Sequence, residues 1–209
     1  MNLTITIARQ LGSGGSELGH RLAEELGIRC IDREIISQTA QQFDVQEQEV
    51  EHREERVTPF WERMLAGFVV GAPEAAYVPP PTQTLTDRQI FDAETEVLKT
   101  ITAQEDCVVI GRAAVHVLPR HARMLNLLIY APVEFRIPRV MQTSGALTPE
   151  QALAKIQQSD TMRGKSISQM TGTDWMSPEH YHLCINTSTF PLDDLCPRLA
   201  EMVRRKMGA

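Results

Sequence analysis

Residues Leu3 to Ile31 read LTITIARQLGSGGSELGHRLAEELGIRCI, and their pattern indicates the fold. Leu3 to Ala8 is typical of a short strand, and the glycine-rich turn at residues 12–15 follows it. Leucines recur on one helical face from Ser16 to Leu26, and Gly27 is placed to end that helix. The next residues form a second short apolar run. Strand, turn, helix and strand within about 30 residues predict the βαβ unit of a parallel sheet.

The rest of the chain continues this alternation. Cys107–Ile110 is an unbroken apolar run, as expected for a strand that is buried on both faces. We expect further strands at 125–130 and 182–186, and helices in 33–65 and at 86–102, 133–142, 191–207 and from Thr148 onwards. Five strands separated by helices predict an α/β fold, a three-layer α/β/α sandwich around a five-stranded parallel sheet.

Two of these helices carry finer predictions. Thr148, Pro149 and Gln151 have the spacing of a capping box with proline at the first helical position, and Ala152 and Ile156 should face inward. The last helix should bury Leu195, Leu199, Met202 and Val203. Residues 67–85 show no periodicity, which is typical of a functional or disordered loop.

Length and charge narrow the classes of function. The chain has 209 residues, 42% of them hydrophobic, a length that predicts one domain. Its net charge of 21 − 27 = −6 disfavours nucleic-acid and membrane-surface partners. No apolar run approaches the roughly 20 residues of a membrane span, and no signal peptide is recognisable, so we expect a cytoplasmic protein. The cysteines show no CxxC spacing, and Cys30, Cys107 and Cys184 should behave as small buried hydrophobes.

The glycine turn has the chemistry of a phosphate loop. Glycines let the backbone approach a ligand closely, and the amides that open the following helix attract an anion. Against the pattern G-x-x-x-x-G-K-[ST], Arg9 stands at the first glycine and Gly15 at the lysine, while Ser16 keeps the hydroxyl that would meet Mg²⁺. Arg9, at the end of a strand, is our candidate for the missing cation. A tight turn without a ligand is the alternative.

The chain resembles the cytidylate kinase-like family, a branch of the P-loop nucleoside monophosphate kinases. The resemblance is carried by ITIARQLGSGG, IDREII, VVIGRAAVHVL, LIYAPVEFRIPRV, SDTMRGKS and HLCINTS, in the order of the family. It implies a single P-loop kinase-like domain over residues 1–209, with a helical acceptor-binding insertion at about 33–105 and a lid at about 139–175. It also implies phosphoryl transfer from ATP or another nucleoside triphosphate to a monophosphate such as CMP, with Mg²⁺.

The resemblance also implies roles for individual residues. The phosphates are expected at Gly12, Ser13, Gly14, Gly15 and Ser16, and the metal at Ser16. Asp32 and Arg112 are expected to bind the acceptor. Arg88 is a further candidate for acceptor binding from its position alone, at the start of the helix expected at 86–102. The residues expected to stabilise the transferred group are Arg9, Arg112, Arg136, Arg139, Asp160 and Arg163. Arginine suits this work because its planar fork grips phosphate and stays charged.

Each of these residues also has a plainer interpretation. Arg136 and Arg139 could be solvated helix residues, and Asp160 with Arg163 an ordinary surface pair. Asp32 could cap a helix. Trp175 more simply packs the base of the lid than stacks on a nucleobase. His180 and His182 could share a metal, but no third ligand is evident.

Three functions stay open on the sequence. The first is an active nucleotide kinase. The second is a degenerate kinase fold that binds a nucleotide or another anion and regulates a partner, because Gly15 replaces the lysine and Ile110 and Ala113 stand where true cytidylate kinases have acids. The third is a kinase for a different small phosphate acceptor.

Overall fold

The computed structural model describes residues 1–32, 87–111 and 113–207. It separates two compact units, Met1–Arg33 with Leu98–Ala209 and, as the second, Glu34–Val97. In the second unit the described residues are 87–97, which begin helix α4 (Asp87–Gln104). The predictions for 33–65, for 67–85 and for Arg112 lie outside the described residues.

The βαβ unit is confirmed. Strand β1 covers Thr4–Arg9, helix α1 covers Gly15–Leu26 and strand β2 covers Arg29–Ile31. Gly27 ends α1 in the left-handed region, with φ of 65°, and its N–H bonds to the carbonyls of Ala23 and Glu24.

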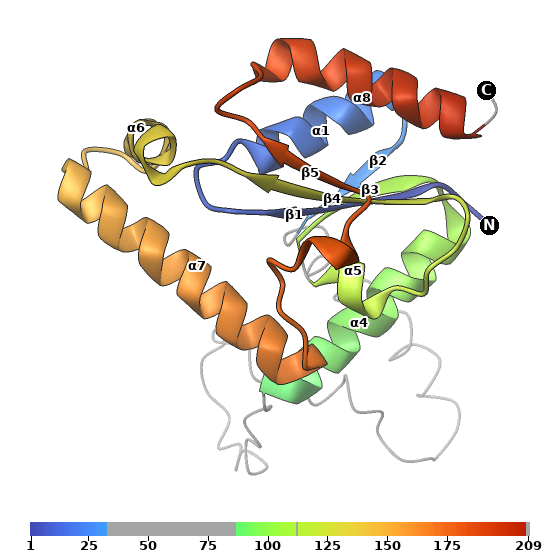
Figure 1. Ribbon diagram of the computed structural model, residues 1–209. Coiled ribbons are helices and arrows are strands. Elements are labelled where there is room, and N and C mark those ends of the chain that lie inside the picture. The colour runs from blue at the N-terminus through green and yellow to red at the C-terminus, as the bar shows by residue number, and fades with distance from the viewer. Residues whose placement is uncertain (33–86, 112, 208–209) are drawn as a thin grey trace, which may run out of the picture. The chain divides into compact units, whose positions relative to one another are not determined.

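The sheet has five parallel strands in the order β2-β3-β1-β4-β5 (Figure 1). Its other members are β3 (Cys107–Ile110), β4 (Met124–Tyr130) and β5 (Leu183–Asn186). In the centre, Thr4 of β1 pairs with Cys107 on one side and with Met124 on the other. The loop after β1 therefore emerges between the carboxyl ends of its neighbours, where open α/β sheets bind ligands.

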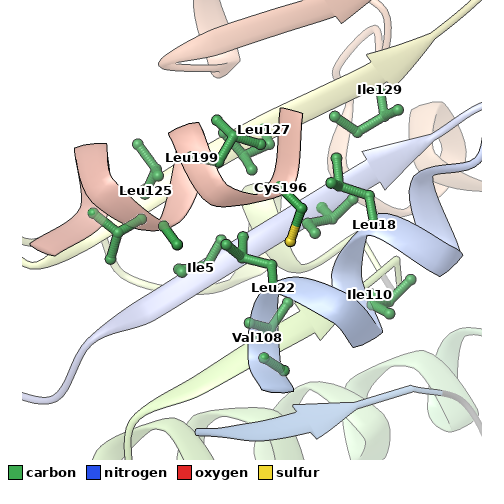
Figure 2. Close-up of a cluster of buried hydrophobic side chains, with 14 of the residues drawn as sticks. Ile5, Leu18, Leu22, Val108, Ile110, Leu125, Leu127, Ile129, Cys196 and Leu199 are labelled. Atoms are coloured by element: carbon green, nitrogen blue, oxygen red, sulfur yellow. The ribbon is translucent and has the colours of Figure 1, made fainter. Parts of the chain in front are cut away.

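Helices cover both faces of the sheet, which confirms the three layers. Helices α1 and α8 (Leu192–Met207) lie together on one face, and α5 (Ala114–Val117) and the end of α4 lie on the other (Figure 1). Figure 2 shows the core on the first face, where Leu18 and Leu22 of α1 meet Cys196 and Leu199 of α8 above Ile5 of β1.

Helices α6 (Val133–Thr143) and α7 (Pro149–Thr171) pack against each other through Val140, Ala152 and Ile156. The predicted capping box is present: the Thr148 hydroxyl accepts from the Gln151 N–H, and the Gln151 side chain accepts from the Thr148 N–H. A 3-10 turn, η1 (Pro178–His180), leads into β5.

Two predictions of burial are wrong. Met202 is 49% exposed, because the buried stripe of α8 runs through Leu192, Cys196, Leu199 and Val203 and passes beside it. Cys184 is exposed because β5 is an edge strand, whereas Cys107 is buried as predicted and Cys30 partly so. Within the described residues, no helix combines the length and the apolar character that crossing a membrane requires.

Candidate functional site

The turn between β1 and α1 has the shape of an anion cradle. Gly14, the N-cap of α1, lies in the left-handed region with φ of 81°, and no described side chain caps the helix. The N–H groups of the first turn of a helix have no intrahelical acceptors. The helix dipole adds partial positive charge at the same place. Gly14, Gly15 and Ser16 therefore carry N–H groups of the kind that bind anions, and their binding of a phosphate stays a prediction.

Ser13 supports this loop from below. Its fully buried hydroxyl lies 2.9 Å from the Gln10 carbonyl and 3.1 Å from the Ile129 carbonyl at the end of β4. The hydroxyl of Thr187, just after β5, donates to the Ser13 carbonyl at 2.6 Å. The Ser13 side chain is thus engaged in holding the turn, and its backbone N–H also donates to the Gln10 carbonyl, at 3.3 Å.

Gly15 leaves room for Arg9. A Cβ atom added to Gly15 would lie 2.5 Å from Cβ of Arg9 and 3.0 Å from Cβ of Ile129. Real Cβ atoms do not approach so closely, so no lysine fits at position 15 while Arg9 keeps its place. The Arg9 side chain therefore fills the space that a lysine side chain at position 15 would need.

The guanidinium of Arg9 spans two parts of the site. Its Nε donates to the exposed Ser16 hydroxyl at 3.3 Å. Its Nη1 lies against Gly111, so closely that a Cβ on that glycine would overlap it. Gly111 has φ of 78° and follows β3 directly. Arg9 therefore connects the glycine turn at residues 12–16 with Gly111 at the end of β3.

Arg139 covers the loop from the α6 side. Its Nη2 would lie 3.0 Å from a Cβ atom on Gly14 and is 2.9 Å from the Glu17 carboxylate in the first turn of α1. The guanidinium also lies over the Phe135 ring, 5.8 Å from its centroid. It is one-third exposed, so it places a cation at the mouth of the cradle.

Arg136, one turn earlier on the same helix, is buried below the loop. Its Nη1 donates to the Asp160 carboxylate at 2.6 Å and to the Leu11 carbonyl at 3.3 Å. The other carboxylate oxygen of Asp160 accepts a long hydrogen bond, 3.5 Å, from the Leu11 N–H. Arg136 and Asp160 together hold both polar backbone groups of Leu11, and we call them the Leu11 clamp.

Arg163 extends the clamp along α7. It reaches Asp160 at 3.4 Å, and its guanidinium lies 5.3 Å from the centroid of the Trp175 ring. Burial lowers the pKa of Arg163, against the opposite influence of Asp160, and the group stays charged at neutral pH. Trp175 is 5% exposed, which fits packing at the base of the predicted lid.

The two remaining predicted acceptor residues have local partners. Asp32 follows β2 and lies 3.8 Å from Nε2 of His20 on α1. Arg88 bonds to Asp92 one turn along α4, at 3.1 Å, within the second unit.

The histidines near β5 do not form a shared strand face. His180 belongs to η1, and Nδ1 of His182 accepts from the Asn126 N–H at 2.8 Å. The ring of His180 instead meets His116 of α5 edge-on, with centroids 4.9 Å apart. Burial is the main reason that the pKa of His116 falls to about 4, and His180 adds to the effect. Within the described part of the chain, no cluster of three potential metal ligands is present.

Some residues of the site were not predicted from the sequence. Gln10 accepts from the Ala131 N–H at 3.3 Å, and Thr187 ties β5 to the loop. The position of Thr187 directly after a strand is a signal that could have pointed to it.

A magnesium ion fits the chemistry of the exposed Ser16 hydroxyl. Mg²⁺ commonly takes few protein ligands and completes its shell with phosphate oxygens and water. Gly14 and Gly15, next to Ser16, have no side chain of their own that would cover the backbone N–H groups of this turn.

Comparisons with known proteins identify the family and the fold of the chain. A model of the cytidylate kinase-like family matches residues 4–189. The crystal structure of an uncharacterized protein from Eubacterium ventriosum is 21% identical with a TM-score of 0.70, over 98% of this chain and 99% of that one. This match shows the fold alone. A comparison with curated proteins finds no match.

Two kinases of known substrate are more distant. A shikimate kinase from Acinetobacter baumannii is 16% identical with a TM-score of 0.45, over 97% of this chain and 93% of that one. A gluconokinase from Sinorhizobium meliloti is 14% identical with the same TM-score, over 98% and 97%. With TM-scores this low, they add nothing to the fold assignment.

Proposed function

The chain belongs to the cytidylate kinase-like family, and from this premise we propose that it transfers the γ-phosphoryl group of a nucleoside triphosphate to a nucleoside monophosphate of the CMP type. The observation that carries the proposal is the place of Arg9. Its guanidinium lies between Ser16, on the triphosphate side, and Gly111, which precedes the predicted acceptor residue Arg112. A transferred phosphoryl group would have to pass between these two sides.

The chain's own residues supply positioning and positive charge. The transferred group spreads negative charge over three equatorial oxygens, and catalysis consists mostly of holding it in line and stabilising that charge. Backbone N–H groups of Gly14 to Ser16 bind the triphosphate, and Arg9 stands for the lysine that commonly bridges its last two phosphates. Mg²⁺, held through Ser16, would neutralise charge on the same phosphates.

The other arginines divide between two tasks. Arg139 lies at the mouth of the cradle and can turn from Glu17 toward a phosphate, so we assign it to the triphosphate. Arg136 and Asp160 are held by each other and by Leu11, and we assign them to positioning the loop. Arg163 is shared between Asp160 and Trp175 and belongs with the clamp.

A second function has its own support. Ile110 and Ala113 flank the GR pair where true cytidylate kinases have acids, and Gly15 replaces the lysine. A protein of this kind would bind a nucleotide or another anion and act as a regulatory module without turnover.

A coupled assay of ATP consumption across nucleoside monophosphates separates the two. Turnover with CMP above about 1 s⁻¹, an ordinary rate for an enzyme, supports the kinase. Arg9→Met should abolish that turnover, whereas Arg29→Met, which removes an exposed arginine paired with Glu105, should not. Tight ATP binding with no consumption for any monophosphate would favour the regulatory module. Consumption with a different phosphate acceptor alone would retain the kinase and change its substrate.

A further inference from the structure

Glu17, in the first turn of α1, was not predicted from the sequence to take part in the site. One oxygen of its carboxylate accepts from Nη2 of Arg139 at 2.9 Å, and the other lies 3.5 Å from Nη1 of Arg21, one turn further along α1. Arg21 in turn bonds to Asp193, at the start of α8, at 2.6 Å. A row of alternating charges therefore connects α6 with α1 and α8, and Glu17 lies between its two arginines.

The nitrogen of Arg139 that Glu17 holds is also the atom of Arg139 closest to the glycine turn. Nη2 would lie 3.0 Å from a Cβ atom on Gly14, whereas Cζ would lie 3.5 Å from it. Gly14 is the N-cap of α1, where the free N–H groups of the first helical turn attract an anion. A phosphate at this turn and the Glu17 carboxylate would therefore draw on the same N–H group of Arg139.

The pair between Glu17 and Arg139 can be exchanged at little cost. The Glu17 side chain is 52% exposed and that of Arg139 is 33% exposed, and ion pairs in contact with water are weak. A phosphate carries more negative charge than a carboxylate and accepts from the same fork of N–H groups. If Arg139 leaves, Glu17 still has Arg21, so the carboxylate keeps a partner.

We propose that Glu17 is a competing anion, which holds Arg139 in the free protein and releases it when a polyphosphate binds at the glycine turn. Glu17 thereby lowers the affinity of this turn for polyphosphates. The inference rests on the part of the proposed function that places a triphosphate at the turn, and it depends neither on the acceptor nor on turnover.

Calorimetric titration of inorganic tripolyphosphate into the full chain tests the proposal, because this probe carries the three phosphates of ATP without the nucleoside. At constant low ionic strength, Glu17→Gln should raise the affinity at least about threefold, since it removes the charge that competes for Arg139. Arg139→Met should lower the affinity about threefold or more. The Tm of Glu17→Gln should stay within about 3 °C of that of the natural protein, because the pair is exposed.

The double variant Glu17→Gln/Arg139→Met separates competition for Arg139 from plain repulsion between the Glu17 carboxylate and the probe. When Arg139 is absent, Glu17→Gln should change the affinity by less than about 1.5-fold. Glu105→Gln is the matched control, because Glu105 also pairs with an exposed arginine, Arg29 at 2.6 Å, but precedes β3 at the amino ends of the strands. It should leave the affinity for tripolyphosphate within about 1.5-fold.

Each other outcome contradicts a different step. An affinity of Glu17→Gln equal to or below that of the natural protein would overturn the proposal, because Glu17 would then position Arg139 or have no part in binding. An equal gain with and without Arg139 would also overturn it and leave charge repulsion alone. If tripolyphosphate bound neither protein, the phosphate site would be wrong, and with it both this inference and the proposed function. A gain that needs Arg139, without turnover for any monophosphate, would support the inference and contradict only the kinase.

Discussion

Arg9 and Arg136 both contact the loop that follows β1, Arg9 at Ser16 and Arg136 at Leu11, and they differ in burial and in their partners. Arg136 is buried, with a side chain only 8% exposed, and it is neutralised by Asp160 at 2.6 Å. Arg9 is partly exposed and lies against the hydroxyl of Ser16 and the backbone of Gly111.

An arginine near a glycine-rich loop can therefore either stabilise the fold or bind a ligand. A buried arginine with a carboxylate partner and a backbone carbonyl has its charge and its donors engaged, so it holds the loop. An arginine that lies between two glycine-rich turns has its guanidinium where a phosphate bound between them would meet it.

The largest effect is expected from Arg9→Met. It keeps most of the stem and removes the charge, so kcat for the proposed reaction should fall by about 10³-fold, near 4 kcal/mol in the transition state. The free energy of unfolding should change by less than about 0.5 kcal/mol, because Arg9 is not part of the core. Steady-state kinetics and urea unfolding give the two numbers. If Arg9→Met lowered the free energy of unfolding by more than about 2 kcal/mol, Arg9 would stabilise the fold as Arg136 does, and the two arginines would not differ in role.

Asp160→Asn should destabilise the fold by about 3 kcal/mol, because it leaves the buried Arg136 without a counter-charge. Asp193→Asn is the matched control: Asp193 also bonds to an arginine, Arg21, at 2.6 Å, but its side chain is 84% exposed. That change should cost less than about 1 kcal/mol in urea unfolding. Equal losses in the two variants would contradict the assignment of Asp160 to the Leu11 clamp.

His116 is a half-buried base that, among the described contacts, has no carboxylate partner, unlike Arg136. Its pKa is lowered from 6.5 to about 4, mainly by burial, so between these values the unfolded chain binds a proton that the folded protein resists. Stability should therefore fall as the pH drops from 6.5 toward 4. The half-buried ring should contribute about 1–2 kcal/mol, after a discount for its contact with solvent.

His116→Asn can keep an acceptor for the Thr173 hydroxyl, which lies 3.0 Å from Nδ1, and removes the titration. Urea unfolding at pH 7 and pH 5 should show a smaller loss on acidification for this variant than for the natural protein. Equal losses of unfolding free energy between pH 7 and pH 5 in the two proteins would mean that groups other than His116 cause the fall in stability.

The smallest effect is expected from Thr148→Ala, which removes the capping hydroxyl from α7, the helix that carries Asp160. It should cost about 1 kcal/mol of stability. Because α7 supports the clamp and not Arg9, kcat at 25 °C should stay within about twofold. A tenfold fall in kcat, with the protein still folded, would link the two regions more closely than their contacts indicate.

The sequence was sufficient for the fold because its signals are local. The apolar runs, Gly27 and the Thr148 capping box each depend on residues close in the chain, and each is found in the structure. Cys184 was misjudged because an apolar run does not tell an edge strand from a central one.

The site was predicted as a set of residues but not as a set of roles. Arg136 and Arg139 lie three positions apart on one helix and look equivalent in the sequence. What separates them is Asp160, a partner 24 residues further along for Arg136, which arrives only through the packing of α6 on α7. Likewise, a glycine at the lysine position indicates, in the sequence, that a cation has been lost. Only the structure shows that the Arg9 side chain occupies the space beside this glycine.

The central claim is that Arg9 takes the place of the lysine at position 15. Calorimetric titration of ATP with Mg²⁺ into Arg9→Gly and into the double variant Arg9→Gly/Gly15→Lys tests it most directly, because the second change uses the space that the first one frees. We expect at least about a tenfold loss of affinity for Arg9→Gly and recovery of most of it in the double variant. Unchanged affinity in Arg9→Gly, with the protein folded, would contradict it.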